Sequence, residues 1–213
     1  EEDQTGDLWI GGNPFENNFI SRAGAPAGLL KLNIQSREIQ EFFADPKDLI
    51  SLSSNRIRSL LVDKTGVLWV GAGISGLNVY DKSVTKFSLV TTGPEEKNKI
   101  RGPIRGFYLD DNKILWVASQ GGGLIAYDRE NEKYEIFNCK ENDPSSISTD
   151  FVQCIYDDGN YLWIGTQQGL NRFDKRTKTF KRFYIDSSNP ASRFNSLNYN
   201  IIEIDKLPGY LWF

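Results

Sequence analysis

The sequence predicts an all-β fold, a β-propeller built from four-stranded blades with repeats of about 47 residues. Two observations carry this prediction. Every tryptophan follows a leucine, and the five Leu-Trp pairs recur at Trp-to-Trp spacings of 60, 47, 47 and 49 residues. Between the pairs, short runs of β-branched and aromatic residues alternate with turn residues, and no stretch has helical periodicity. A four-stranded repeat of about 40–50 residues is typical of a propeller blade.

Each repeat follows one local pattern around its tryptophan. In the second repeat a polar turn with Asp63 and Gly66 precedes Trp69, and small residues follow it. An Asp side chain accepts hydrogen bonds from the backbone two residues on, and Gly supplies the positive φ that closes such a turn. A Gly-Leu pair then opens the next strand, and an aromatic residue closes the unit, at Phe43, Phe87, Phe137 and Phe180. The third repeat departs from the pattern, with Ala118-Ser119 after its tryptophan and no Gly in its turn.

The pattern predicts four strands per unit and a tryptophan between units. In the second repeat we expect strands at Ile57–Val62, Val67–Ala72, Leu77–Tyr80 and Lys86–Val90. A single sheet of this kind cannot bury both faces, so neighbouring blades must stack. We therefore expect the recurring tryptophans to form a core between blades rather than a ligand platform; they are Trp9, Trp69, Trp116, Trp163 and Trp212.

The whole chain, 1–213, is expected to be one propeller segment. Its repeats cover about 1–50, with an insertion at 13–27, then 51–95, 96–142, 143–188 and a partial blade at 189–213. The first and last tryptophans occupy the same strand of the unit, so a ring closed after four blades would contain that strand twice. Since propellers have four to eight blades, and since the chain begins at Glu1, we expect a piece of a larger ring.

Composition excludes several functions. The chain has no His, two Cys, and 25 basic against 28 acidic residues. Without His there is no Ser-His or Cys-His catalytic pair and no His metal site. The slight negative charge argues against nucleic-acid binding, and no apolar run approaches the ~20 residues that span a bilayer. We expect no metal, no cofactor, no membrane contact, and no disulfide between Cys139 and Cys154.

The repeats resemble those of a known family. Tyr161-Leu-Trp-Ile-Gly-Thr166, followed by Gly169-Leu-Asn-Arg-Phe-Asp174, is similar to the two-component regulator propeller repeat. The segment from Asp63 to Gly71 shares the pattern, and Asp143-Pro-Ser-Ser-Ile-Ser resembles the linker between such repeats. The resemblance recurs five times and covers essentially the whole chain.

This resemblance implies a context that composition alone does not. Such repeats form seven-bladed propellers in the periplasmic sensor region of hybrid two-component regulators of Bacteroidetes, ahead of a membrane helix and a histidine kinase. Many of these regulators sense glycan fragments. The resemblance therefore implies a non-catalytic, extracytoplasmic sensor segment that binds an oligosaccharide or another small ligand. Its partners would be the remaining blades, neighbouring periplasmic modules and, as an open alternative, a second copy.

The loops supply the candidate binding residues. Strand alternation places the loops between the second and third strands on the same propeller face as the blade-to-blade connections. Exposed aromatics beside amides and Arg suit a polyhydroxylated ligand, because rings stack on the aromatics and amides bond hydroxyl groups. The candidates are Asn13, Phe15, Asn17, Asn18, Phe19, Arg22, Gln120, Gln167 and Gln168. The alternative is a variable surface loop, or an insertion whose Phe15 and Phe19 pack into the core.

Two other functions remain open at this point. A propeller scaffold for docking or dimerisation would show a large exposed apolar patch on its outer strands or loop face. A propeller glycan hydrolase or lyase would need paired carboxylates that face one cavity. The Asp and Glu residues instead recur in turns, blade after blade, which is the distribution expected of structural residues.

Overall fold

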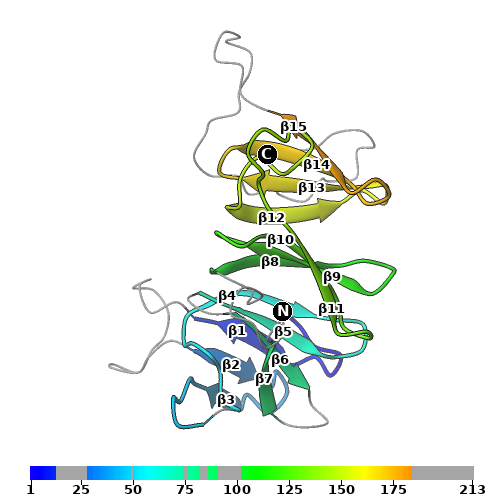
Figure 1. Ribbon diagram of the computed structural model, residues 1–213. Helices are drawn as coiled ribbons and strands as arrows, with labels where there is room; N and C mark the ends of the chain where they lie inside the picture. The colour runs from blue at the N-terminus through cyan, green and yellow to red at the C-terminus, as the bar shows by residue number, and fades with distance from the viewer. Residues whose placement is uncertain (13–27, 49, 74–75, 82–85, 91–101, 184–213) are drawn as a thin grey trace, which may run out of the picture. The chain divides into compact units, whose positions relative to one another are not determined.

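The computed structural model describes residues 1–12, 28–48, 50–73, 76–81, 86–90 and 102–183. These residues form fifteen β-strands and, within those ranges, no helix (Figure 1). They divide into two compact units, Glu1–Ile104 and Arg105–Phe213. We describe each unit by itself.

The strands form four antiparallel sheets whose strand order follows the chain, and we call these sheets blades 1 to 4 (Figure 1). Blade 1 holds β1 (Leu8–Gly11), β2 (Leu29–Leu32) and β3 (Ile39–Phe42), and blade 2 holds β4 (Ile57–Val62), β5 (Leu68–Ala72), β6 (Leu77–Asp81) and β7 (Lys86–Val90). Blade 3 holds β8 (Ile104–Leu109), β9 (Ile114–Ser119), β10 (Gly123–Asp128) and β11 (Lys133–Phe137). Blade 4 holds β12 (Val152–Asp157), β13 (Tyr161–Thr166), β14 (Gly169–Asp174) and β15 (Thr179–Phe183).

The predicted fold class is confirmed, and the predicted strands of the second repeat agree with the structure to within one residue at each end. β5 begins at Leu68 rather than Val67, and β6 ends at Asp81 rather than Tyr80. The agreement follows from the turn residues on either side of each run, because a strand ends where Asp or Gly forms a turn.

The aspartate before each tryptophan ties the turn to the indole ring. In blade 2, Oδ1 of Asp63 accepts the backbone N–H groups of Thr65 at 2.9 Å and Val67 at 3.0 Å. Its other oxygen, Oδ2, accepts the indole N–H of Trp69 at 3.0 Å. The same bond to the indole recurs in the other blades, from Trp9 to Asp3 at 3.1 Å, Trp116 to Asp110 at 2.9 Å and Trp163 to Asp158 at 2.7 Å. One carboxylate thus closes the turn and fixes the ring.

The third repeat forms the same turn without its glycine. Lys113 occupies the position of Gly66, three residues after the aspartate, and both have a positive φ, 64° and 84°. The N–H of Lys113 donates to the carbonyl of Asp110 at 3.0 Å, as that of Gly66 does to Asp63 at 2.9 Å. A lysine in this left-handed conformation is strained, because its Cβ approaches the following carbonyl oxygen.

Aromatic rings form the core between neighbouring blades of each unit. In the first unit the ring of Trp9 lies 5.5 Å from that of Phe42 in its own blade and 5.2 Å from that of Tyr80 in blade 2. In the second unit the ring of Trp116 lies 6.2 Å from Phe137 and 5.4 Å from Phe173 of blade 4. The prediction of Phe43 as the closing aromatic is therefore wrong, since Phe42 holds the position of Phe137. A shift of one residue along a strand moves the side chain to the other face.

The small residue after each tryptophan lets the next blade approach. A Cβ placed on Gly11 would lie 2.6 Å from Cγ2 of Ile57, the first residue of β4. In blade 3 Ala118 replaces this glycine, and Val152 replaces the isoleucine in the same core cluster. One methyl group is gained on one blade and lost on the other, which keeps the packed volume nearly constant. This compensation accounts for Ala118 in the third repeat.

The recurring tryptophans differ in burial. Trp9, Trp69 and Trp116 are 2%, 1% and 6% exposed. Trp163 is half-buried, and Trp212 lies outside the described residues.

The first prediction concerns the bond between aspartate and indole. We expect Asp63→Ala to lower the free energy of unfolding by about 3 kcal/mol, because it removes the acceptor of the buried N–H of Val67, the N–H of Thr65 and the buried indole of Trp69. Chemical denaturation of the purified protein measures this. Lys64→Ala, at the exposed neighbouring position, serves as the control and should change stability by less than about 0.5 kcal/mol. Equal effects of the two substitutions would contradict the assigned role of Asp63.

The second prediction concerns the strained turn of blade 3. We expect Lys113→Gly to stabilise the protein by about 0.5–1 kcal/mol, because Gly adopts positive φ without a steric cost. The lost ion pair with Glu130 subtracts little, since both side chains are exposed. The thermal midpoint reports the change. Gly66→Ala, the reverse exchange in blade 2, should lower it, and a lowered midpoint for Lys113→Gly would refute the strain.

Candidate functional site

One position varies sharply among otherwise similar blades, the residue directly across from the tryptophan on the next strand. The register pairs Trp9 with Lys31, Trp69 with Val79, Trp116 with Ala126 and Trp163 with Arg172. Directly opposed residues of an antiparallel pair share one face of the sheet. The side chain at this position therefore determines what lies over the tryptophan.

In blades 1 and 4 this position carries a cation. Nζ of Lys31 lies 5.7 Å from the ring of Trp9 and 2.6 Å from Oδ2 of Asp7. The hydrogen bond with Asp7 raises the pKa of Lys31 above its ordinary value, against the opposing effect of burial. In blade 4 the guanidinium of Arg172 lies 4.2 Å from the ring centre of Tyr161 and 5.9 Å from that of Trp163. In both blades the cation thus has interaction partners within the chain, which are aromatic rings and, in blade 1, also a carboxylate.

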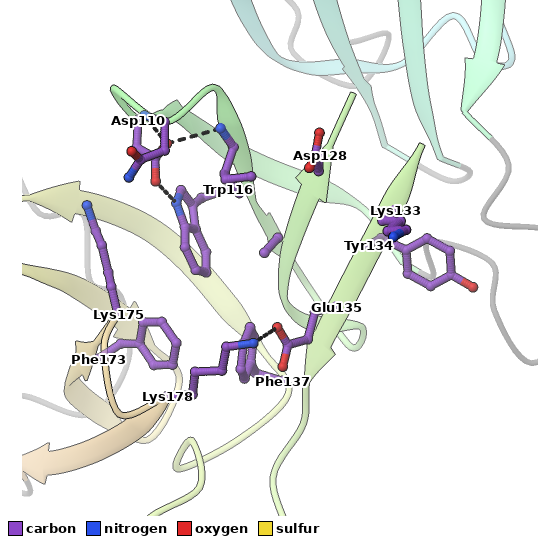
Figure 2. Close-up of a pocket in the computed structure, with 13 residues that line it drawn as sticks. Asp110, Trp116, Asp128, Lys133, Tyr134, Glu135, Phe137, Phe173, Lys175 and Lys178 are labelled. Carbon is purple, nitrogen blue, oxygen red and sulfur yellow. Dashed lines mark hydrogen bonds and ion pairs between the residues drawn. The ribbon is translucent and has the colours of Figure 1, made fainter. Parts of the chain in front are cut away.

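Blade 3 has no such side chain, and a cleft forms between blades 3 and 4 (Figure 2). The cleft has a volume of about 540 Å³. Its floor is apolar and consists of Ile114, Trp116, Ala126, Phe137 and Phe173. Ile114 stands where blade 1 has Asp7, two residues before the tryptophan. The corresponding hollow in blade 1, of about 500 Å³, is lined instead by polar side chains that include Asp7 and Lys31, and it does not reach Trp9.

Charged side chains of both signs surround the cleft. The carboxylates are Asp110, Asp128 and Glu135, and the ammonium groups are Lys133, Lys175 and Lys178. Lys178 of blade 4 extends across to Glu135 of blade 3 and pairs with it at 2.5 Å, and Figure 2 shows this pair beside the ring of Phe137. Figure 2 also shows the ring of Tyr134 turned away from Trp116. The rim therefore carries carboxylates and ammonium groups in equal number.

Two of these rim groups have fixed surroundings. Lys175 pairs with the buried carboxylate of Asp157. Burial and then the charge of Asp157 raise the pKa of the nearby Tyr108 hydroxyl to about 12, so Tyr108 stays protonated. The side-chain amide and the backbone N–H of Asn131 hold the pKa of Asp128 below its ordinary value. Asp128 is therefore charged at neutral pH.

The sequence-predicted glutamines lie at the other end of the strands of blades 3 and 4. Gln120 forms an isolated bridge with Phe151, and the backbone N–H of Gln167 donates to the carbonyl of Phe151 at 3.1 Å. The N–H of Gln168 donates to the hydroxyl of Thr166 at 3.2 Å. The side chain of Phe151 is 44% exposed. We call this group the loop surface; it consists of Gln120, Phe151, Gln167 and Gln168.

The sequence did not single out Phe151, although a signal was present. It is an aromatic residue immediately before the first strand of its blade, where blades 2 and 3 have Arg56 and Pro103. The remaining predicted site residues stay predictions, because they lie outside the described residues; they are Asn13, Phe15, Asn17, Asn18, Phe19 and Arg22.

Among the described residues, no group of three or more Cys, Asp or Glu could hold a metal ion. Cys139 and Cys154 are not joined by a disulfide. The described part of the chain also contains no helix with the length and apolarity that a bilayer crossing requires.

The comparisons with known proteins agree with the repeat pattern. Residues 51–73 match the two component regulator propeller family, which confirms the resemblance predicted from the repeats. No curated protein sequence matches the chain.

Solved structures share the fold. The extracellular domain of a one-component system protein from B. thetaiotaomicron is 22% identical over 92% of this chain and 23% of its own, with a TM-score of 0.68. The extracellular domain of a hybrid two-component system from the same organism is 20% identical over 87% of this chain and 30% of its own, with a TM-score of 0.59. Virginiamycin B lyase from Staphylococcus aureus is 14% identical over 88% of this chain and 55% of its own, with a TM-score of 0.60. The chain thus spans about a quarter to a half of these proteins.

The third prediction concerns acid stability. Partial burial acts to raise the pKa of Asp158, but the N–H groups of Trp163, Tyr161 and Asn160 outweigh it, so the pKa lies below the ordinary 3.8. Because the pKa of Asp158 is lower in the folded than in the unfolded chain, the ionised carboxylate stabilises the fold at pH values above its unfolded-state pKa. This stabilisation is lost as the pH falls through the folded-state pKa. We expect the free energy of unfolding to decrease as the pH is lowered below about 4. In Asp158→Asn this decrease should be less steep. Denaturant unfolding between pH 6 and pH 2 measures both, and parallel curves would exclude this role of Asp158.

Proposed function

We propose that this chain is a non-catalytic segment of an extracytoplasmic sensor, which binds an oligosaccharide and passes the signal to a histidine kinase elsewhere in the same protein. The remaining blades and neighbouring periplasmic modules would be its partners within that protein. The structural likeness to extracellular domains of B. thetaiotaomicron signalling systems supports the location and the general role. It shows a shared fold, so the ligand has to be argued from this chain itself.

The observation that carries the proposal is the loop surface. The backbone of Phe151, a residue that is 44% exposed, is joined to Gln120 of blade 3 and to Gln167 of blade 4. A sugar ring packs its C–H face on such an aromatic, and primary amides donate to and accept from its hydroxyl groups. Loops on a rigid scaffold are also where proteins commonly place binding residues.

A catalytic role has weaker support. Virginiamycin B lyase has the same fold, and its histidine-to-alanine variant is described as catalytically inactive. These 213 residues contain no histidine. The carboxylates around the cleft are engaged in turns or with lysines, for example Asp110 with Trp116 and Glu135 with Lys178. A propeller hydrolase or lyase would instead need two carboxylates free to act on one substrate bond.

One observation favours a docking or dimerisation scaffold as the second candidate. Ile39 on β3 and Leu89 on β7, the outermost strands of blades 1 and 2, are 60% and 46% exposed. Single exposed apolar residues are ordinary, so this candidate ranks below ligand binding.

The fourth prediction tests the proposed function. Calorimetric titration of a panel of oligosaccharides into the intact extracytoplasmic region should find one that binds with micromolar affinity. Phe151→Ala/Gln167→Ala should weaken that binding at least tenfold, because it removes the ring and one amide of the loop surface. Asn17→Ala/Phe19→Ala tests the insertion in the same way.

Glu132→Ala, in a hairpin turn at the opposite end of blade 3, is the control and should bind normally. Binding that neither double variant weakens would keep the sensor and discard both proposed surfaces. No binding across the panel would exclude oligosaccharide sensing and favour the docking scaffold.

A further inference from the structure

The cleft between blades 3 and 4 exists because Ala126 is small. At the same position blade 1 has Lys31 paired with Asp7, blade 2 has Val79, and blade 4 has Arg172 stacked on Tyr161. The side chains of Lys31 and Arg172 lie over the tryptophans opposite to them, and Val79 shares one face of the sheet with Trp69. In blade 3 the small methyl group of Ala126 leaves a hollow whose apolar lining includes Trp116, Phe137 and Phe173. Trp116 and Phe173 are themselves buried, so Ala126, Ile114 and Phe137 form the part of this lining that a ligand can contact.

The floor of the cleft argues against a cationic ligand. In blade 1 the lysine over the indole is held by a carboxylate, Asp7. Blade 3 has Ile114 at that position, and the carboxylate of Asp110 already accepts the indole N–H of Trp116 and the backbone N–H of Ile114. A cation seated over Ala126 would thus lose water without gaining a partner on the floor, which is costly.

The rim argues for a neutral ligand with hydroxyl groups. Three carboxylates and three ammonium groups line the cleft. Lys175 is paired with Asp157, Lys178 is paired with Glu135, and Lys133 lies directly across from Asp128 in the register. An anionic ligand would therefore compete with a carboxylate at each lysine. A hydroxyl group can donate to a carboxylate and accept from an ammonium group at the same time. A rim of alternating charges therefore suits a neutral ligand with several neighbouring hydroxyl groups better than a ligand that carries a net charge.

The pair at the mouth of the cleft can give way to such a ligand. Lys178 and Glu135 belong to hairpins of different blades, and their side chains are 56% and 46% exposed. Exposed ion pairs of this kind contribute little to stability. Hydroxyl groups can replace each partner with hydrogen bonds to a charged group, which are stronger than neutral ones.

We propose that the cleft between blades 3 and 4 binds one neutral sugar ring, with its apolar face on Ala126 and Ile114 and its hydroxyl groups on Glu135 and Lys178. Trp116, which is 6% exposed, lies beneath them. A volume of about 540 Å³ is within the range of small-ligand sites. This inference rests on the proposed oligosaccharide-sensing function but places a second subsite at the opposite end of the strands from the loop surface. Ala126 is the residue that admits the ligand.

Matched probes test the ligand class. We would record saturation-transfer NMR on the intact extracytoplasmic region with methyl glycosides of glucose, galactose, mannose and xylose. Methyl glucuronide and methyl glucosaminide present comparable rings with a negative and a positive charge. We expect at least one neutral glycoside to bind with millimolar affinity and both charged probes to bind at least fivefold more weakly. A charged probe that binds more tightly than every neutral one would overturn the neutral class.

Matched variants test the location. Ala126→Val installs the side chain of Val79 and should weaken binding of the neutral glycoside at least fivefold while leaving the thermal midpoint within about two degrees. Glu135→Ala, at a half-exposed position, should also weaken it and guards against a folding defect in the first variant. Phe151→Ala removes the ring of the loop surface and distinguishes binding there from binding in the cleft. Lys64→Ala, at an exposed turn position that lies in neither surface, is the control.

The outcomes separate this inference from the proposed function. Loss of binding with Ala126→Val and Glu135→Ala, but not with Phe151→Ala, supports the cleft. If sugars bind and both cleft variants bind as tightly as the parent, the cleft is not a subsite and the sensor function stands on the loop surface. If no glycoside and no oligosaccharide binds, both the inference and the proposed function fall.

Discussion

The bond between one aspartate carboxylate and one indole N–H is the constraint on which the rest of this structure depends. Because Oδ1 of Asp63 closes the turn and Oδ2 holds Trp69, the turn and the ring cannot move independently. The ring in turn determines which aromatic of the next blade can pack, as Trp9 does with Tyr80. A local polar contact that spans five or six residues thereby sets the spacing between blades, and it recurs in all four.

A scaffold fixed in this way confines variation to a few positions. The turns and the aromatic core must be repeated, so blades can differ only where neither is disturbed. The residue opposite the tryptophan is one such position, with Lys31, Val79, Ala126 and Arg172 in the four blades. The loops between the second and third strands are another, and there Gln120 and Gln167 lie next to Phe151. Both candidate binding surfaces therefore arise where the repeat is free to diverge.

The sequence alone was sufficient for the fold and only partly sufficient for the site. The Leu-Trp spacing and the turn residues predicted the blades because each has a local chemical cause. The prediction of Phe43 instead of Phe42 was wrong because the two adjacent phenylalanines point to opposite faces, and residue type alone does not tell which of them faces the core. The sequence did not predict that Lys113 takes the position of a glycine, because a positive φ at a single lysine produces no recognisable sequence pattern. The cleft was missed because it arises from a missing side chain, and Ala126 is informative only beside its counterparts in other blades.

The rigidity of the blades restricts how a bound ligand could signal. A ligand shifts an equilibrium only by the difference between its affinities for the two states. The cleft is formed by side chains of blades 3 and 4, whose packed core of Trp116, Phe137, Phe173 and Phe180 resists any change in spacing. A sugar that contacts this core and its rim alone would bind equally well in both signalling states and would switch nothing. A ligand of a sensor built on these blades must therefore also contact a module that moves relative to them, so an oligosaccharide, with further rings beyond the one in the cleft, suits the role better than a monosaccharide.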